Sequence, residues 1–589
     1  MKKNYIKSCI AMLCLLFTNI IFAQNDTILV TQGLGTLEEA IKSHKGDVVY
    51  KLKAGAWYGL TSIVEVSDAT MGPGKGLVIV GEKTNGMPAV IQVGNDGGGA
   101  VFNSLFNAFN DLTLKNVFLV AQDFSGAGGA NVITISNKIN LVVDKVVMDP
   151  AGLNYTFAGG RPSYESKAWV TNSLIIRNGN MGGPNDGGIF QDIVFDTLYF
   201  ENNTIASSGQ DFLGAGFHPN PNHKFLWINH NSFFWHDVWL KKSYNDNALY
   251  MTNNLFHDIS IFAQLYAWGQ FFPDYMQGNE MLSQLAADTL ELADGTNETL
   301  PSSRISFWQR NLQYNSEGLR SLPKYARDNK LTPIYSIPFV WDENTPQYYA
   351  SDAPVTDLVK KSRENRIFND DVNFPNFKFN HCSYDIDPGY IDKKIYDISD
   401  NVGEHIIGWF SKLIWGVPGA PEVNDLPSYN WDIDLWSGTK PEDYPVVWPR
   451  FNGAYTNPDL LKASTEGLPL GDLNWFPNEK AKWEANKDEI MKHILSLNED
   501  QFTITGINIL TENGSFRMFP NPVTNELRIE SKDMLSIINV YNIGGQMVKS
   551  KTVNSTTATI DFSDVINGVY LIKAKNIKGV TNTYKLIKE

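Results

Sequence analysis

A short pattern that recurs along the chain constrains its fold more than any other feature. Each copy has two apolar residues separated by one residue, then a polar residue and, in most copies, an Asn. An apolar-x-apolar triplet points two side chains to one face of a β-strand, and Asn bends the chain because it tolerates left-handed backbone angles. The copies lie 23 to 33 residues apart and begin at Leu112, Leu141, Leu174, Leu198, Leu226 and Leu249, with a looser copy near Phe307.

Repetition of this unit predicts an all-β body in which like strands stack into parallel sheets, each rung buried only by its neighbours. We therefore expect a right-handed parallel β-helix. A β-propeller is the alternative, but its blades are more even and roughly 40 to 50 residues long. One corner of the coil is predicted to carry a side-chain amide ladder, interrupted at Lys145 and His230, that contains Asn116, Asn178, Asn202 and Asn253.

Two helices are predicted to accompany this body, because the ends of a β-helix expose an apolar layer and an unpaired strand edge. Residues 36–43 have a short amphipathic pattern suited to the N-terminal end. Residues 482–497 have a second amphipathic pattern, with Asn478 as its N-cap. Residues 282–303 are predicted to be an insertion, in which the stretch 281–292 is helical.

From about residue 511 the chain consists of short alternating apolar and polar runs bounded by Asn, Gly, Asp and Pro, which predicts a small antiparallel β-sandwich. Its motifs are Pro520-Asn521-Pro522, the run 540–545 (VYNIGG), Gly568-Val569-Tyr570 and a Lys-rich end with Lys585 and Lys588. In this order and at the C-terminal end, they resemble the type A sorting domain of the type IX secretion system of Bacteroidetes. The resemblance implies export through the outer membrane, with the secretion machinery as partner and the cell surface or medium as destination.

The N-terminus has the three parts of a secretory signal: a basic start, an apolar run from Cys9 to Phe22, and the small residue Ala23. The run is shorter than the roughly 20 residues of a spanning helix, so we expect cleavage and no transmembrane segment afterwards. Of the three Cys, only Cys382 then remains, which leaves no internal disulfide. The expected domains are 1–24 signal peptide, 25–500 β-helix body with an N-terminal cap and an irregular C-terminal part ending in a helix, 501–511 linker, and 512–589 sorting domain.

The segment Gly471-Asp472-Leu473-Asn474-Trp475, together with the strand repeats, resembles secreted pectate-lyase-like β-helix proteins of Bacteroidetes over residues 30–500. This resemblance implies a polysaccharide as partner. The net charge of -15 argues against nucleic acid, because phosphate binding needs a concentrated basic surface. There is neither a phosphate-binding Gly loop nor a Gly-x-Ser-x-Gly elbow.

The stretch from His236 to Ser243, followed by Asn247, is similar to the Lys-Ser-x-x-Asn region of alginate-lyase and chondroitinase-B type β-helices. Elimination from an acidic polysaccharide needs a base that removes the proton next to the substrate carboxylate. It also needs a cation that stabilises the enolate. On this resemblance Lys242 would be the base, and Asp237 would replace a metal-binding Glu. The Arg-His-Gly pattern expected downstream is absent. The remaining candidates of this stretch are His236 for catalysis and Trp239 and Lys241 for carbohydrate binding.

A second candidate site is formed by Asp186, Asp192 and Asp196, which lie close together in the sequence. Carboxylates on neighbouring rungs can bind Ca²⁺ or act as the acid and base of a glycoside hydrolase. Turn formation explains them as well, because Asp186 is followed by two Gly. His218, His223, His230 and His236 are four of nine His, but they lack the ligand spacing of a zinc site.

Two functions remain open on the sequence. The first is a lyase or glycoside hydrolase that acts on extracellular polysaccharide. The second is a non-catalytic surface protein that binds glycan, mediates adhesion or has a structural role. Both agree with the expected fold and export route, and fold-level analogy alone does not separate them.

Overall fold

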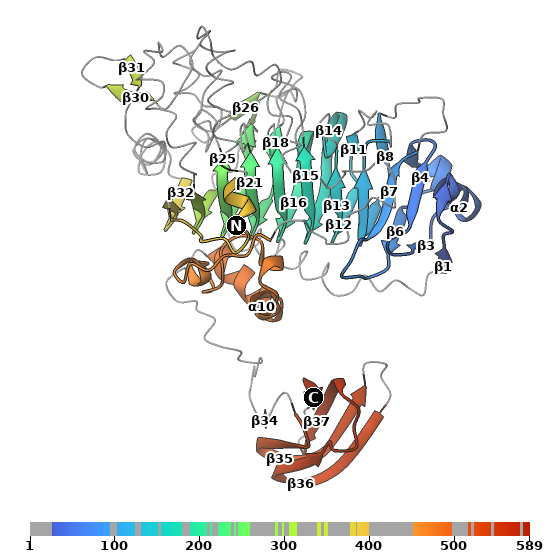
Figure 1. Cartoon of the computed structure of the whole chain (residues 1–589), viewed down its shortest axis with the longest axis vertical. Helices are drawn as coiled ribbons and strands as arrows, with labels where there is room; N and C mark the ends of the chain where they lie inside the picture. The colour runs from blue at the N-terminus through green and yellow to red at the C-terminus, as the bar shows by residue number, and fades with distance from the viewer. Residues whose placement is uncertain are drawn as a thin grey trace. The chain divides into compact units, whose positions relative to one another are not determined.

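The computed structural model describes residues 26–94, 103–123, 131–150, 155–178, 189–208, 212–214, 222–236, 241–242, 245–259, 289–291, 297–299, 305–314, 339–342, 347–350, 377–384, 386–397, 399, 452–496, 516–519, 523–542, 547–577 and 581–588. The chain divides into two compact units, 1–503 and 504–589. Each unit is described by itself (Figure 1).

The first unit is a coil of parallel strands stacked in columns (Figure 1). The first column consists of β1 (Thr27–Leu29), β3 (Val49–Leu52), β6 (Leu77–Gly81), β9 (Leu112–Lys115), β12 (Asn140–Asp144), β14 (Phe157–Thr171), β16 (Phe190–Glu201), β20 (Leu226–Asn229), β24 (Ala248–Thr252), β28 (Ile305–Gln309) and β32 (Phe377–Asn380). The second consists of β2 (Gly33–Leu34), β4 (Trp57–Leu60), β7 (Ala89–Val93), β10 (Val117–Val120), β13 (Val147–Asp149), β15 (Leu174–Asn178), β17 (Thr204–Ser208), β21 (Ser232–His236), β25 (Leu255–Ile259), β29 (Leu312–Tyr314) and β33 (Ser383–Tyr384).

A third column joins the first through the N-terminal halves of the long strands β14 and β16. It contains β5 (Val64–Val66), β8 (Ser104–Ala108), β11 (Asn131–Ile135), β18 (Leu213–Gly214) and β22 (Lys241–Lys242). A short parallel pair, β19 (Asn222–His223) and β23 (Asn245–Asp246), lies outside the columns. The predicted parallel β-helix is therefore confirmed, and right-handed winding is the general rule for parallel crossover connections.

Five of the six predicted copies of the repeat stack in the first column. Leu112 pairs with Leu141, Leu198 with Leu226, and Leu226 with Leu249. The copy at Leu174 was assigned wrongly, because it belongs to the second column. Its place in the first column is taken by Ala168, which pairs with both Leu141 and Leu198. The error arises because apolar-x-apolar-polar-Asn describes strands of both columns equally well.

The corner between the first and second columns carries a left-handed residue in each rung from β9 to β28. Their φ angles lie between 49° and 57°, and the residues are Asn116, Lys145, Asn172, Asn202, His230, Asn253 and Arg310. The amide ladder follows one position later than predicted: Asn203 donates to Asn231, Asn231 to Asn254, and Asn254 to Asn311, at 3.0 to 3.1 Å. Asn178 is not part of it, because it lies at the end of β15 and bonds Thr156 and Ser208.

The core of the coil consists of inward rows of apolar side chains in register. One row of the first column contains Leu114, Val143, Val170, Phe200 and Ile228, all fully buried. In the third column Phe157 stacks on Phe190, with ring centroids 4.7 Å apart. Such rows bury apolar surface continuously along the coil axis, which is the main stabilising contribution to a repeat fold of this kind.

The N-terminal helix is confirmed as α2 (Thr36–His44), which buries Leu37 and Ile41. The C-terminal helix α10 (Pro477–Ser496) begins earlier than predicted, with Pro477 at its first position and Asn478 inside it rather than capping it. It ends a segment of residues 452–496, the flank segment, that includes the short helices η5 (Leu460–Lys462) and η6 (Leu473–Trp475). Part of the helix predicted over 281–292 is wrong, because β26 (Thr289–Glu291) pairs antiparallel with β27 (Asn297–Thr299).

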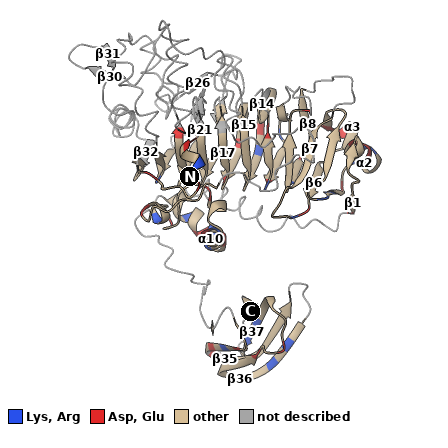
Figure 2. Cartoon of the chain, in the orientation of Figure 1, with Lys and Arg blue, Asp and Glu red and all other residues tan. Residues whose placement is uncertain are grey.

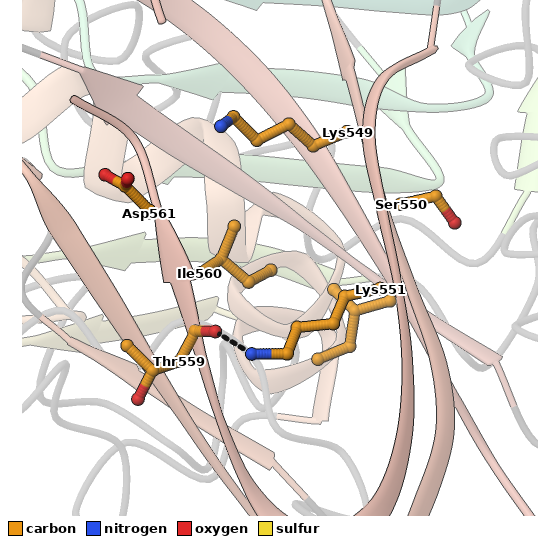
Figure 3. Close-up of a pocket in the computed structure, with 7 residues that line it drawn as sticks. Lys549, Ser550, Lys551, Thr559, Ile560 and Asp561 are labelled. Carbon is orange, nitrogen blue, oxygen red and sulfur yellow. Dashed lines mark hydrogen bonds between the residues drawn. The ribbon is translucent and has the colours of Figure 1, made fainter. Parts of the chain in front are cut away.

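The second unit is an antiparallel β-sandwich built from β34 (Phe516–Phe519), β35 (Glu526–Asn542), β36 (Met547–Asp561), β37 (Gly568–Asn576) and β38 (Thr581–Lys588). Register shifts near residue 535 divide β35 into two halves. Its core includes Leu527, Ile538, Ile560 and Ile572. Figure 2 shows blue residues on β36. There Lys549 and Lys551 line a pocket of about 330 Å³, and Lys551 Nζ donates to the Thr559 carbonyl at 2.6 Å (Figure 3).

Candidate functional site

Strand β22 places Lys241 and Lys242 at the end of the third column. Leu213 pairs with Lys241, and Gly214 pairs with Lys242. The row that ends at Lys241 continues through Leu213, Phe190 and Phe157, which are buried in the core of the coil. Successive residues of a strand alternate between its two faces. The row in register with Lys241 is the inward one, and the row in register with Lys242 is the outward one.

The outward row that contains Lys242 is made of polar and small residues. It runs through Gly214, Gln191, Ala158, Thr134 and Asn107, in that order. Gln191 is 8% exposed and Ala158 6% exposed, while Thr134 and Asn107 are half-buried. This face therefore combines uncharged hydrogen-bonding side chains with Gly and Ala, which have little or no side chain.

The other members of the predicted Lys242 site lie elsewhere or outside the described residues. His236 ends β21 in the second column, where it pairs with Ser208 and Ile259. It is therefore separated from Lys242 by the corner between the second and third columns. Asp237 and Trp239 lie outside the described residues, so their roles stay predictions.

The two described carboxylates of the Asp cluster are both engaged in the fold. Asp192 has a φ of 54° and is 3% exposed, at a position where β14 and β16 shift register. A Cβ at Gly159 would lie 2.0 Å from the Asp192 carbonyl, so the two backbones approach closely there. Asp196 forms an ion pair with Lys224 at 2.5 Å. Asp186 lies outside the described residues, and the described part of the chain contains no group of three metal-ligating side chains.

The histidines that follow one another in the sequence have separate surroundings. His223 accepts a hydrogen bond at Nδ1 from the Phe195 backbone N–H at 3.1 Å and stacks on the Phe195 ring. His230 is the left-handed corner residue of its rung and contacts the flank segment. His218 lies outside the described residues. The fold therefore gives the described histidines structural partners of their own.

A buried polar seam between the corner residues and the flank segment is the feature that sequence reasoning missed. The flank segment follows the corner back along the coil: Ala463 bonds Arg310, Thr465 bonds Asn253, Asn474 bonds Asn202, and Lys480 bonds Asn172. These partners are more than 150 residues apart in the sequence. The only sequence signal was the interruption of the Asn row by His230, which indicated a different local environment.

At the centre of the seam His230 forms a buried ion pair with Glu466, and both side chains are fully buried. His230 Nδ1 lies 3.1 Å from the Gly471 carbonyl, which can only accept. Both ring nitrogens therefore face acceptors, an arrangement that favours the doubly protonated cation. Burial lowers the pKa of His230, but the carboxylates of Glu466 and Glu201 outweigh it and raise this pKa above its usual 6.5.

Next to this pair, Asp472 points into the seam and is 3% exposed. Its carboxylate accepts hydrogen bonds from Thr204 Oγ1 at 2.7 Å and from the Asn474 N–H at 2.8 Å. Burial nevertheless raises the pKa of Asp472 to about 6, against the opposing effect of Lys480. Burial also lowers the pKa of Lys480, whose ammonium bonds the side chains of Asn172 and Asn474.

Helix α10 adds a buried charge pair over the outer face of the first column. Lys487 Nζ lies 3.0 Å from Glu201 Oε2, 4.8 Å from the Tyr199 ring centre and 4.7 Å from the Trp483 ring centre. Glu201 also accepts hydrogen bonds from Trp227 Nε1 and Asn229 Nδ2. Every oxygen of this buried carboxylate therefore has a partner, which is the condition for tolerating a charge in the interior.

A second buried cluster lies on the outer face of the second column. His257 Nε2 lies 2.6 Å from Ser399 Oγ and 3.2 Å from Asp258 Oδ2, and His257 Nδ1 lies 3.0 Å from the Tyr390 hydroxyl. A nucleophilic triad needs the serine and the carboxylate on opposite ring nitrogens. Here both face Nε2, and Ser399 is fully buried. The geometry is that of a structural network, not of an activated serine.

Comparison with known families and structures identifies the C-terminal part of the chain. Residues 517–589 match the family described as "Secretion system C-terminal sorting domain". The curated proteins contain no match to the chain. Two solved structures share local similarity: an immunoglobulin-like β-sandwich protein of the DUF3244 family from Bacteroides vulgatus (17% identity, TM-score 0.12, covering 13% of this chain and 87% of that chain) and the PL6 family alginate lyase AlyGC (14% identity, TM-score 0.23).

The alginate lyase match covers 41% of this chain and 35% of that lyase. At these TM-scores neither similarity assigns an activity. The sorting domain does fix the destination: the protein is exported by the type IX secretion system to the cell surface or the extracellular space, and the secretion machinery is its partner. Among the described residues, no helix is long and apolar enough to span a membrane.

Proposed function

We propose that this exported β-helix protein acts on extracellular polysaccharide by elimination, with Lys242 as the catalytic base. The proposal is supported by the backbone register of β22, in which Lys242 pairs with Gly214 of the outward row and Lys241 with Leu213 of the inward row. A base must reach a substrate on the outer face of the coil, and on this register Lys242 rather than Lys241 is proposed for that role.

Elimination is favoured over glycoside hydrolysis by the state of the described carboxylates. Hydrolysis uses two carboxyl groups on opposite sides of the scissile bond. Asp196 is paired with Lys224, and Asp192 is buried where two strands shift register. Neither is therefore disposed as a paired acid and base. An amine base requires no such pair.

In the proposed step, the neutral amine of Lys242 removes the proton on the carbon next to a uronate carboxylate. The electron pair forms a carbon–carbon double bond, the glycosidic carbon–oxygen bond breaks, and the departing oxygen takes a proton from solvent. Charge on the enolate must be balanced by a cation. Ca²⁺ is our candidate for it, with Asp237 as ligand.

The test uses the full chain and a panel of uronate and neutral polysaccharides. Product with a new double bond, detected by ultraviolet absorbance, is expected from at least one uronate polymer. Lys242→Ala should reduce this rate by about a hundredfold or more, in the range of general-base catalysis. Lys241→Ala is the matched control and should retain activity wherever its fold is intact. Equal losses in both variants would remove Lys242 from the mechanism.

Glycan binding without turnover is the second candidate function. It is supported by the uncharged hydrogen-bonding side chains of Gln191, Thr134 and Asn107 in the outward row. Binding to immobilised polysaccharide, with no unsaturated and no reducing-end product, would establish this function instead.

A further inference from the structure

We propose that the flank segment is a pH-controlled strap, which docks firmly on the corner of the β-helix in mildly acidic medium and loosens as the medium becomes alkaline. The proposal rests on the chemistry of the seam. Most segments that cover a β-structure bury apolar side chains against it. This segment does so with Leu460 and Leu470, but it also places Glu466 and Asp472 on polar corner residues, out of water.

The first proton-dependent contact is the pair of His230 and Glu466. Both ring nitrogens of His230 face acceptors, the Glu466 carboxylate and the Gly471 carbonyl. Loss of the ring proton at Nε2 would leave a lone pair against a buried carboxylate, with the ring of Trp483 on another side at 6.4 Å. Among the described residues, Glu466 would retain its side-chain contact to Asn253, at 3.3 Å. Deprotonation therefore converts an attraction into a repulsion inside the seam.

The second proton-dependent contact is Asp472. When it is protonated, its burial carries no charge penalty; when it ionises, a buried carboxylate must be compensated by Thr204, Asn474 and the ammonium of Lys480. Charged groups face the seam from the corner residues and from the flank segment, including α10. Around His230 they are Glu466 and Glu201; Glu201 is paired with Lys487; around Lys480 they are Asp472, Glu484, Asp144 and Lys145.

The direction of the pH effect is the same for both contacts. The pKa of His230 is raised above 6.5, so its stabilisation is complete below that pH and is lost as pH rises through the higher value. The pKa of Asp472 is raised from 3.8 to about 6, so between these values the docked state keeps a proton that the undocked state releases, and docking weakens as pH rises from about 3.8 to about 6. Lys480 acts in the opposite direction, because burial lowers its pKa from 10.5.

Hydrogen exchange of the full chain measures docking directly. Amide protons of residues 463–475, corrected for the intrinsic pH dependence of exchange, should be about tenfold or more better protected at about pH 5.5 than at about pH 8. Strands β9 and β12 should keep their protection at both pH values. Unchanged protection of 463–475, or an equal loss in the strands, would overturn the strap.

Two variants assign the effect to its groups. Asp472→Asn removes one titration, and His230→Asn places at the corner the residue that the neighbouring rungs have at Asn202 and Asn253. Each should reduce the pH-dependent loss of protection, and the double variant should show less than about a threefold change. Glu479→Gln is the control, because Glu479 pairs with Lys482 within α10 and its side chain is 31% exposed; it should behave like the wild type. A double variant that retains the full pH dependence would refute the assignment.

Discussion

Asn231 donates a hydrogen bond to Asn254 Oδ1 across one rung of the coil at 3.0 Å, and both side chains are fully buried. Asn231 Oδ1 accepts in turn from Asn203, and Asn231 Nδ2 also bonds the Phe200 carbonyl. The ladder thus provides hydrogen-bond partners for backbone groups at the sharp corner and links one rung to the next. Because its members polarise one another, the bonds support each other.

Breaking the ladder in its middle should destabilise the body. Asn231→Ala leaves buried partners on Asn203 and Asn254 unpaired, and each unpaired group costs about 1–3 kcal/mol. We expect a loss of about 2–4 kcal/mol in the free energy of unfolding. Urea denaturation followed by Trp fluorescence measures the body alone, because all 15 Trp precede residue 504. Asn140→Ala, at an exposed Asn that bonds Asp111, is the control and should change stability by less than about 1 kcal/mol.

The aromatic centre of the third column should be sensitive to truncation. Phe190 stacks on Phe157 and makes edge contacts to Phe195, Phe200 and Phe212. Phe190→Ala creates a cavity in this cluster and should cost about 3–5 kcal/mol. Phe109→Ala removes the same atoms from a residue that is 51% exposed and serves as the matched control. Comparable losses in both variants would contradict a close-packed core at Phe190.

Removal of one partner of the buried pair under α10 should cost more than removal of a surface charge. Lys487→Ala leaves the carboxylate of Glu201, which is 1% exposed, without its cation. The expected loss is about 3–5 kcal/mol. Lys482→Ala breaks the pair with Glu479 on the same helix, where both side chains are about 30% exposed, and should cost less than about 1 kcal/mol. The two denaturation midpoints, measured side by side, decide the matter.

The sorting domain should unfold without affecting the body. Ile560→Ala truncates a residue that is 4% exposed in its core and should destabilise the domain by about 2–4 kcal/mol. Lys551→Met keeps the apolar stem over the pocket and should change little. Proteolysis of residues 504–589 reports the domain, while Trp fluorescence should give an unchanged midpoint for the body. Ile560→Ala should also reduce the fraction of protein at the cell surface and in the medium.

The elements that depend on a local sequence pattern could be predicted. The stacking of Leu198, Leu226 and Leu249 was predictable because each strand has its own apolar triplet and its own turn residue. The amide ladder was placed one residue too early, because consecutive Asn pairs such as Asn202 and Asn203 share two roles. The first adopts the left-handed angle and the second forms the ladder, and composition does not tell the two apart.

The seam could not be predicted from the sequence, for a physical reason. Glu466 and His230 are 236 residues apart, and nothing in the pattern around Glu466 marks it as a buried ion. Its burial follows from the path of the flank segment along the corner, which only tertiary structure supplies. Likewise, Asp196 resembled a free carboxylate in the sequence, because Lys224, its partner, comes from a different rung.

The return path of the flank segment has a consequence for the order in which the chain becomes complete. The corner residues from Asn172 to Arg310 are synthesised long before Lys480 and Ala463, which bond them. A chain that ends before these residues exposes corner side chains that are buried in the full chain. The flank segment no longer covers them. Since the sorting domain follows directly, the export tag reaches the machinery only on molecules whose covering layer has already been made.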